Sequence, residues 1–197
     1  MAVARLNEPR GATSFRGTNV SADAATDPEL VAAWRGGDEF AAAELVRRHA
    51  SPLGRYLAAC GAGTDEVDDL VQDCFFKAFR GLSGWRGDGS FRGWLFRIGG
   101  NLVKDGFRRR KGRVFVAIED HEVVDRADPD GELAADEAAS RLAEGLRHLP
   151  RLQREVFLLR VQQGMSYEAI AAALDSTPGA ARVHYHHAVK RLKGWLG

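Results

Sequence analysis

Residues 166–192 read SYEAIAAALDSTPGAARVHYHHAVKRL, and this stretch has the pattern of two helices joined by a tight turn. Ser166 is a suitable N-cap for a short first helix, and Thr177 is one for a longer second helix with Pro178 in its first turn. The residues between the two helices supply a short polar turn. Two helices with so short a connection are typical of a helix-turn-helix, whose second helix enters the major groove of DNA.

The second helix has two distinct faces. Four small or apolar residues at helical spacing are predicted to pack against the first helix. They are Ala181, Tyr185, Ala188 and Leu192. The side chains that we predict to contact duplex DNA are Thr177, Arg182, Val183, His186, His187 and Lys190. A plain helical hairpin with a basic outer face is the alternative. We predict no metal site among the histidines, because adjacent positions point to different sides of a helix and no acid or thiol lies near in sequence.

A second basic segment, residues 80–113, holds ten Lys and Arg residues against two acids. Its first part is rich in glycine and is expected to form an exposed loop that carries Trp85, whereas residues 91–110 have helical spacing. Basic side chains follow phosphates, and exposed aromatic rings stack on unpaired bases at ~1–3 kcal/mol per base. The mixture therefore indicates single-stranded or melted nucleic acid. Core packing is the alternative; we expect it for Trp94 and Phe107, and leave it open for Phe91.

Residues 64–79 are predicted to form an amphipathic helix that begins after Thr64 as N-cap. Val67, Leu70, Val71, Cys74, Phe75, Ala78 and Phe79 form one apolar stripe at helical spacing. The opposite face carries Asp69, Gln72, Asp73 and Phe76. An acidic face of this kind suits a basic partner surface.

The chain is expected to be all-α, with two small helical domains joined by a flexible acidic linker. Residues 1–26 lack periodicity and are predicted to be a flexible extension. Residues 27–113 would form the first domain, with a helix that stops near residue 36 and another interrupted at Pro52. Residues 114–137 contain nine acids and one arginine, which is linker composition, and residues 138–197 would form the second domain. The linker acids could chelate a cation weakly, but a solvated linker is the preferred interpretation.

The composition excludes several classes of protein. Among the 197 residues, no apolar run approaches the ~18 that cross a bilayer, and the N-terminal stretch lacks the apolar core of a secretion signal, so we expect a cytoplasmic protein without membrane insertion. Cys60 and Cys74 are predicted to be two buried thiols. We find no phosphate-binding loop, no Ser/His/Asp order and no paired carboxylates in an apolar setting, so neither an enzyme nor a cofactor is predicted.

Three ordered blocks of the sequence resemble the extracytoplasmic-function sigma factors, the smallest members of the sigma-70 class. The blocks are DDLVQDCFFKAF at 68–79, FRGWLFRI at 91–98 followed by Asn101, and Leu149-Pro150 through SYEAIA at 166–171. The resemblance covers roughly residues 27–196. Gly99-Gly100 and Val183-His184 depart from the usual family pattern, and the glycines are expected to weaken their helix by ~1 kcal/mol each.

The resemblance implies a non-enzymatic subunit that directs core RNA polymerase to promoters and helps to melt them. Asp69, Gln72, Asp73 and Phe76 would dock on the clamp coiled coil of the largest polymerase subunit. The minus-10 element would be bound by Trp85, Arg86, Phe91, Arg97, Asn101, Lys104, Arg108 and Arg109. The six residues of the helix-turn-helix would read the minus-35 element as duplex.

The family also implies contact with the polymerase flap and an anti-sigma partner. A polymerase-independent helix-turn-helix regulator is the main alternative, and a single-strand-binding protein is another.

Overall fold

The computed structural model describes residues 25–82, 85, 90–110 and 135–196. This part of the chain contains eight helices and no strand, so the all-α prediction is confirmed. The helices are α1 (Asp27–Arg35), α2 (Glu39–Ala59), α3 (Val67–Gly81), α4 (Phe91–Arg110), α5 (Ala135–Arg147), α6 (Arg151–Val161), α7 (Tyr167–Ala173) and α8 (Pro178–Leu196). The N-terminal extension to residue 24, most of the glycine-rich loop and the linker to residue 134 lie outside the described residues.

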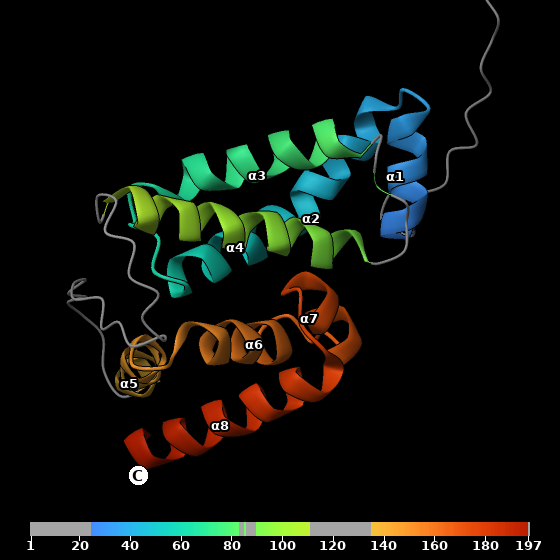
Figure 1. Cartoon of the computed structure of the whole chain (residues 1–197). Coiled ribbons are helices and arrows are strands. Elements are labelled where there is room, and N and C mark those ends of the chain that lie inside the picture. Colours follow the sequence, from blue (N-terminus) through green and yellow to red (C-terminus); the bar gives the residue numbers. More distant parts are fainter. Residues whose placement is uncertain (1–24, 83–84, 86–89, 111–134, 197) are drawn as a thin grey trace, which may run out of the picture.

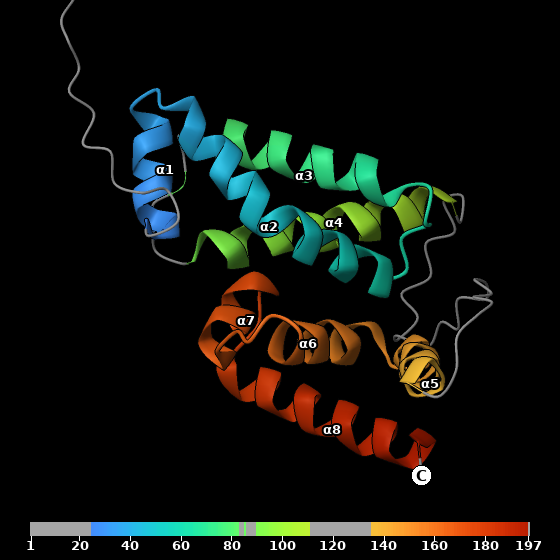
Figure 2. The same ribbon diagram turned by 180° about the vertical axis from the view of Figure 1, so that it is seen from behind.

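The helices form two groups that pack against each other. Figures 1 and 2 show α1–α4 on one side, here called the N-terminal bundle, and α5–α8 on the other, here called the C-terminal bundle. α7 packs against α4, and α5 and α6 pack against α2. The face of α4 that points toward the C-terminal bundle is therefore partly covered, whereas α3 and α8 lie on opposite outer sides (Figure 1).

α1 and α2 are set by local capping. The Glu29 carboxylate accepts hydrogen bonds from the Thr26 N–H (2.7 Å) and hydroxyl (2.8 Å), so α1 begins at Asp27 and its N-cap is the last residue of the predicted extension. Gly37 has φ +95°, a backbone region that favours glycine, and it ends the first helix as predicted. Asp38 then caps α2 by accepting from the Phe40 N–H at 2.9 Å.

The predicted interruption at Pro52 is wrong, because α2 runs unbroken from Glu39 to Ala59. Proline has no N–H, so one helical hydrogen bond is lost there. Leu45 before the proline and Leu53 and Leu57 after it are fully buried, and this shared burial keeps the two halves in one helix.

α3 differs from the prediction at its start, whereas α4 spans the predicted helix. α3 begins at Val67 because residues 64–66 form a turn, so Thr64 is not its N-cap. The glycine pair does not interrupt α4. A Cβ on Gly99 would lie 3.0 Å from Leu57 Cδ2 and 3.2 Å from Leu53 Cδ1, so glycine is needed where α4 crosses closely over α2.

The C-terminal bundle contains the predicted helix-turn-helix. The Ser166 Oγ accepts from the Ala169 N–H and the Thr177 Oγ1 from the Ala180 N–H, both at 3.1 Å, so both predicted N-caps are confirmed. Asp175 in the turn has φ 51°, a left-handed conformation that costs a residue other than glycine some free energy. α5 begins at Ala135, three residues before the predicted domain boundary.

Both cysteines are buried and free, as predicted. Burial raises the pKa of each thiol, that of Cys74 to about 12, so both remain protonated at neutral pH and are poor nucleophiles. None of the described helices has the length and apolar content needed to cross a bilayer.

Candidate nucleic-acid and partner interfaces

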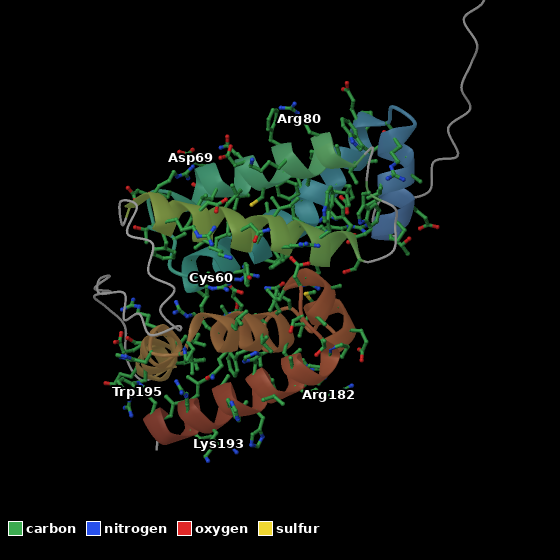
Figure 3. The ribbon with its side chains drawn as sticks, viewed as in Figure 1. Cys60, Asp69, Arg80, Arg182, Lys193 and Trp195 are labelled. Carbon is green, nitrogen blue, oxygen red and sulfur yellow. The ribbon has the colours of Figure 1, made fainter. Side chains whose placement is uncertain are left out.

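The outer face of α3 presents the four residues predicted to contact a protein partner. Asp69, Gln72, Asp73 and Phe76 are all exposed, Phe76 by 60%, whereas Cys74, Phe75 and Ala78 on the opposite face are buried. The Arg80 guanidinium lies 5.4 Å from the centre of the Phe76 ring. Asp69 and Arg80 both point away from the body of the protein (Figure 3). The face combines carboxylates with an exposed aromatic ring, which suits a basic surface with an apolar centre.

The outer face of α8 is also exposed, and on it Arg182 lies 3.4 Å from the Glu168 carboxylate and over the Tyr167 ring of α7. All six residues predicted to contact duplex DNA are exposed: Thr177, Arg182, Val183, His186, His187 and Lys190. The predicted inner stripe is confirmed, because Ala181, Ala188 and Leu192 are buried and Tyr185 is half-buried against Phe157 at 6.1 Å between ring centres. Arg182 and Lys193 lie along the outer side of α8 (Figure 3).

Trp85 is not the free loop residue that the sequence predicted. Its ring is half-buried and stacks on Trp94, with 6.0 Å between ring centres and 19° between planes. The Arg35 guanidinium of α1 lies over the ring, 5.8 Å from its centre, and donates hydrogen bonds to the carbonyls of Leu82 and Trp85. The Trp85 indole therefore packs on the N-terminal bundle, because apolar side chains of α4 cover part of the ring. Arg86 lies outside the described residues.

Phe91, which was predicted to contact the minus-10 element, lies in the core. Its side chain has 0% exposure and packs against His49 and Trp94, with ring centres 5.7 and 6.2 Å apart. A ring enclosed in this way has no face for a base, so we assign Phe91 to the core, the alternative that the sequence left open. The first turn of α4 places it there, since helical spacing aligns it with the fully buried Leu95.

The other residues predicted for minus-10 DNA lie along α4. Arg97, Asn101, Lys104 and Arg108 recur at helical spacing and are exposed or half-exposed, as is Arg109. Arg108 lies 3.8 Å from Asp105 in the same helix. The spacing aligns the first four as a strip on which a phosphate backbone could lie.

Part of this strip is already bound to the C-terminal bundle. The Arg97 Nη2 lies 2.6 Å from the Asp175 carboxylate in the helix-turn-helix turn. Five residues earlier, Arg92, which is not part of the strip, donates a hydrogen bond to the Gln163 side-chain carbonyl. No local pattern predicts these two pairs, because 78 and 71 positions separate the partners and only packing brings them together.

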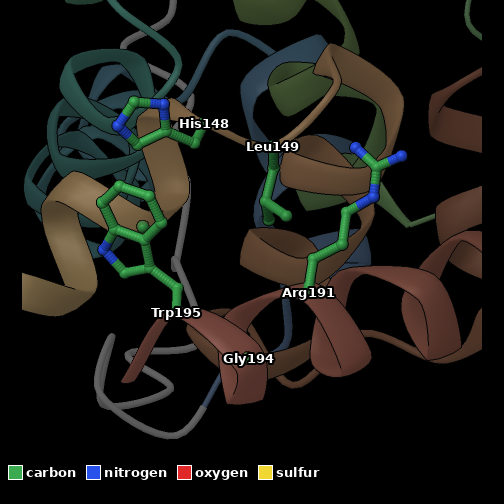
Figure 4. Close-up of a pocket in the computed structure, with 6 residues that line it drawn as sticks. His148, Leu149, Arg191, Gly194 and Trp195 are labelled. Atoms are coloured by element: carbon green, nitrogen blue, oxygen red, sulfur yellow. The ribbon is translucent and has the colours of Figure 1, made fainter. Parts of the chain in front are cut away.

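A shallow hollow of about 340 Å³ lies where α5 meets the end of α8 (Figure 4). Its lining residues are Gly145, His148, Leu149, Arg191, Gly194 and Trp195. The His148 and Trp195 rings are 4.3 Å apart between centres. None of the lining residues is a carboxylate or a thiol, so the hollow lacks the paired acid and base of a hydrolytic site.

Comparison with known families accounts for both bundles. The model for sigma-70 region 2 matches residues 45–113, and the model for sigma-70 region 4 matches residues 139–192. The sigma factor NccH of Alcaligenes xylosoxydans xylosoxydans is 33% identical over 88% of this chain and 96% of its own length. The extracytoplasmic-function sigma-E factor of Escherichia coli K12 is 32% identical over 80% of this chain and 87% of its own.

Two solved structures share the fold. The sigma factor CnrH, solved in complex with the cytosolic domain of CnrY, has a TM-score of 0.67 and 31% identity over 86% of this chain and 96% of that chain. The sigma factor RpoE of Bartonella quintana, solved with the anti-sigma factor NepR, has a TM-score of 0.61 and 25% identity over 78% of this chain and 94% of that chain.

The two bundles and their exposed helices define a transcription initiation factor with a helix-turn-helix. The chain belongs to the sigma-70 family of RNA polymerase sigma factors, and within it to the extracytoplasmic-function group.

Proposed function

We propose that this sigma factor binds core polymerase through the outer face of α3, the melted minus-10 strand through α4 and the minus-35 duplex through α8. The observation that carries the proposal is the separation of the exposed faces. The acidic and aromatic face of α3 and the polar face of α8 lie on opposite outer sides of the molecule, so neither partner obstructs the other (Figure 3).

For core polymerase, we propose that Asp69 and Asp73 pair with basic residues of the clamp coiled coil and that Phe76 packs at the centre of the contact. An exposed phenyl ring beside two carboxylates fits the usual anatomy of a transient interface, with an aromatic centre and a charged rim. Contact with the flap is assigned to the C-terminal bundle on the family resemblance.

For the minus-10 element, we propose that Arg97, Lys104 and Arg108 follow the phosphates of the non-template strand, with Asn101 and the loop that contains Arg86 holding a flipped base. Arg109 adds charge at the end of the strip. Flipping a base costs a few kcal/mol, which stacking and hydrogen bonds to base edges offset. Trp85 would contribute only the part of its ring that remains exposed.

For the minus-35 element, we propose that Arg182, His186, His187 and Lys190 contact phosphates and base edges of the duplex. Val183 is 53% exposed on this face, and its methyl groups suit the methyl group of thymine. Thr177 caps the N-terminus of α8, and this end of the helix would bind a phosphate of the duplex.

We also propose that residues 27–113 and 138–197 act as the two domains, joined by the acidic linker 114–137 and preceded by the extension 1–26. The protein would act in the cytoplasm without catalysis of its own, since the polymerase forms the phosphodiester bonds. An anti-sigma partner is proposed because the relative RpoE was solved with the anti-sigma factor NepR, and CnrH was solved with the cytosolic domain of a second protein, CnrY.

Run-off transcription with bacterial core polymerase on a genomic promoter library tests the proposal. The wild-type chain should give promoter-specific transcripts, and Asp69→Lys/Asp73→Lys should lose them together with core binding. Glu39→Lys/Glu137→Lys is the matched control, because it reverses two exposed acids away from the α3 face. Tight DNA binding without transcripts or core association would favour the polymerase-independent regulator.

A further inference from the structure

Arg35, the last residue of α1, contacts a part of the N-terminal bundle that is distant in sequence. Its guanidinium donates hydrogen bonds to the carbonyls of Leu82, the C-cap of α3, and of Trp85, which lie 47 and 50 positions away. It also lies over the Trp85 ring, 5.8 Å from the ring centre. A guanidinium is planar and carries five N–H donors, so one side chain can bridge two carbonyls and contact an aromatic ring.

The packing of α1 on α3 brings Arg35 to this place. Trp34, the residue before it, contacts Phe79 of α3 with 5.2 Å between ring centres, and Figures 1 and 2 show α1 beside the C-terminal end of α3. The last residue of α1 therefore meets the last residues of α3. Because the final carbonyls of a helix carry partial negative charge, a cation is favoured where two such ends meet.

Trp85 is held by α3 and α4 as well as by α1. Its N–H donates to the Leu82 carbonyl at 3.2 Å, so this oxygen accepts from both Trp85 and Arg35. The Trp94 ring of α4 stacks on the Trp85 ring. Trp94 lies close to the end of α3 because residue 81 is glycine, where an added Cβ would lie 3.1 Å from the Trp94 Cζ2. Three helices thus determine the position of one indole.

The partners of Arg35 indicate what its contacts do. Among the described residues they are two carbonyls and an aromatic ring, not a carboxylate. The contacts therefore order the main chain and the ring of Trp85 instead of neutralising an acid. Trp85 is also the residue of the minus-10 set whose ring remains only half-exposed, so a small displacement changes the part of the ring that a base can reach.

We propose, on the basis of the function proposed above, that Arg35 is a positioning residue for the minus-10 site. It fixes the main chain and the ring of Trp85, and thereby the part of the indole offered to the non-template strand, without contacting the strand itself. Removal of Arg35 should increase the population in which Trp85 leaves its place on Trp94 by about three- to tenfold, because two hydrogen bonds and a ring contact are lost.

Fluorine NMR of the chain labelled with 5-fluorotryptophan tests the positioning without polymerase or DNA. The chain has four tryptophans, and Trp85→Phe identifies the Trp85 signal. Arg35→Ala should shift or broaden that signal, whereas the signal of Trp195 in α8 should stay unchanged. Arg55→Ala is the matched control, because Arg55 is an exposed arginine of α2 that donates to the Ser51 hydroxyl of the same helix at 2.6 Å. An unchanged Trp85 signal in Arg35→Ala would overturn the proposal.

A competition between two promoters tests the consequence for DNA. Two templates that differ in one base of the minus-10 element would be transcribed by core polymerase in the same reaction, once the wild-type chain has identified a promoter. The ratio of the two transcripts does not depend on how much of the variant is folded. Arg35→Ala should lower this discrimination by about three- to tenfold, and Arg55→Ala by less than about twofold, while both keep core binding.

Arg35→Lys separates geometry from charge. A lysine keeps the charge but has no planar fork to bridge two carbonyls, so we expect it to discriminate as poorly as Arg35→Ala. Full discrimination by Arg35→Lys would overturn the positioning role, since charge alone would then suffice. Normal discrimination by Arg35→Ala would remove only this role, whereas the absence of transcripts with the wild-type chain would remove the proposed function itself.

Discussion

The faces of α4 and α8 proposed to bind DNA both carry basic residues, but their surroundings differ. Both carry basic residues at helical spacing. On the exposed α8 face Arg182 is paired with Glu168 of the neighbouring α7, whereas on α4 Arg92 and Arg97 are bound to the other bundle. The difference shows that basic spacing identifies a surface for a polyanion without revealing whether the surface is available. Duplex binding should therefore be present in the isolated chain, and single-strand binding should be suppressed.

The largest effect is expected from a substitution that forces α4 away from α2. Gly99→Val would place methyl groups against Leu53 and Leu57, where even a Cβ is at 3.0–3.2 Å, and we expect a loss of about 2–3 kcal/mol in the free energy of unfolding. Denaturant unfolding followed by circular dichroism measures it. Gly194→Ala of α8, which has nothing within 4 Å, is the control and should be neutral or stabilising by up to ~1 kcal/mol. Equal destabilisation by both changes would contradict this packing argument.

The second largest effect is expected on duplex binding by the exposed face of α8. Lys190→Ala should weaken binding of the isolated chain to minus-35 duplex and reduce the slope of log affinity against log salt by about 1, because one phosphate contact is lost. Fluorescence anisotropy across a salt series measures both values. An unchanged slope would remove Lys190 from the phosphate-binding set.

A smaller effect is expected for Arg97 of α4, which is paired with the C-terminal bundle. Arg97→Ala should change oligo(dT) binding by the isolated chain by less than about twofold, because Asp175 already occupies the side chain. In the Asp175→Asn background the same substitution should cost more, since Arg97 is then released. Equal losses in the two backgrounds would show that the pair does not limit access.

The smallest effect concerns acid stability of the N-terminal bundle. Hydrogen bonds from Arg47 and Arg48, at 2.6 and 2.5 Å, lower the pKa of Glu44 from 4.5 to about 2. A lowered pKa in the folded protein stabilises it above pH 4.5, and this stabilisation is lost as the pH falls from 4.5 toward 2. Thermal unfolding of Glu44→Gln across this range should show a shallower loss on acidification than the wild type does.

Much of the local structure could be predicted because its causes lie within a few residues. Ser166 and Thr177 cap helices that begin immediately after them, and the stripes of α3 and α8 follow from helical spacing. Pro52 misled the prediction, because helix propensity is a local preference that burial between neighbouring helices overrides.

The residues predicted to contact DNA also divide into those that a local pattern could place and those that it could not. The predicted residues of α8 are exposed, as the spacing indicated, because the periodicity of a single helix separates its outer face from its buried stripe. For Trp85 and Phe91, position in the sequence could not distinguish a stacking ring from a core ring. Contacts with Arg35, His49 and Trp94 decide it, and two of these come from helices distant in sequence.

The family, the helices and the charged helix faces follow from the amino-acid sequence, because periodicity and capping act over three or four residues. That Trp85 and Phe91 are covered, and that Arg97 is paired with Asp175, follows from the packing of the helices. Those contacts join residues up to 78 positions apart, and their existence depends on how whole helices pack, which no local pattern encodes.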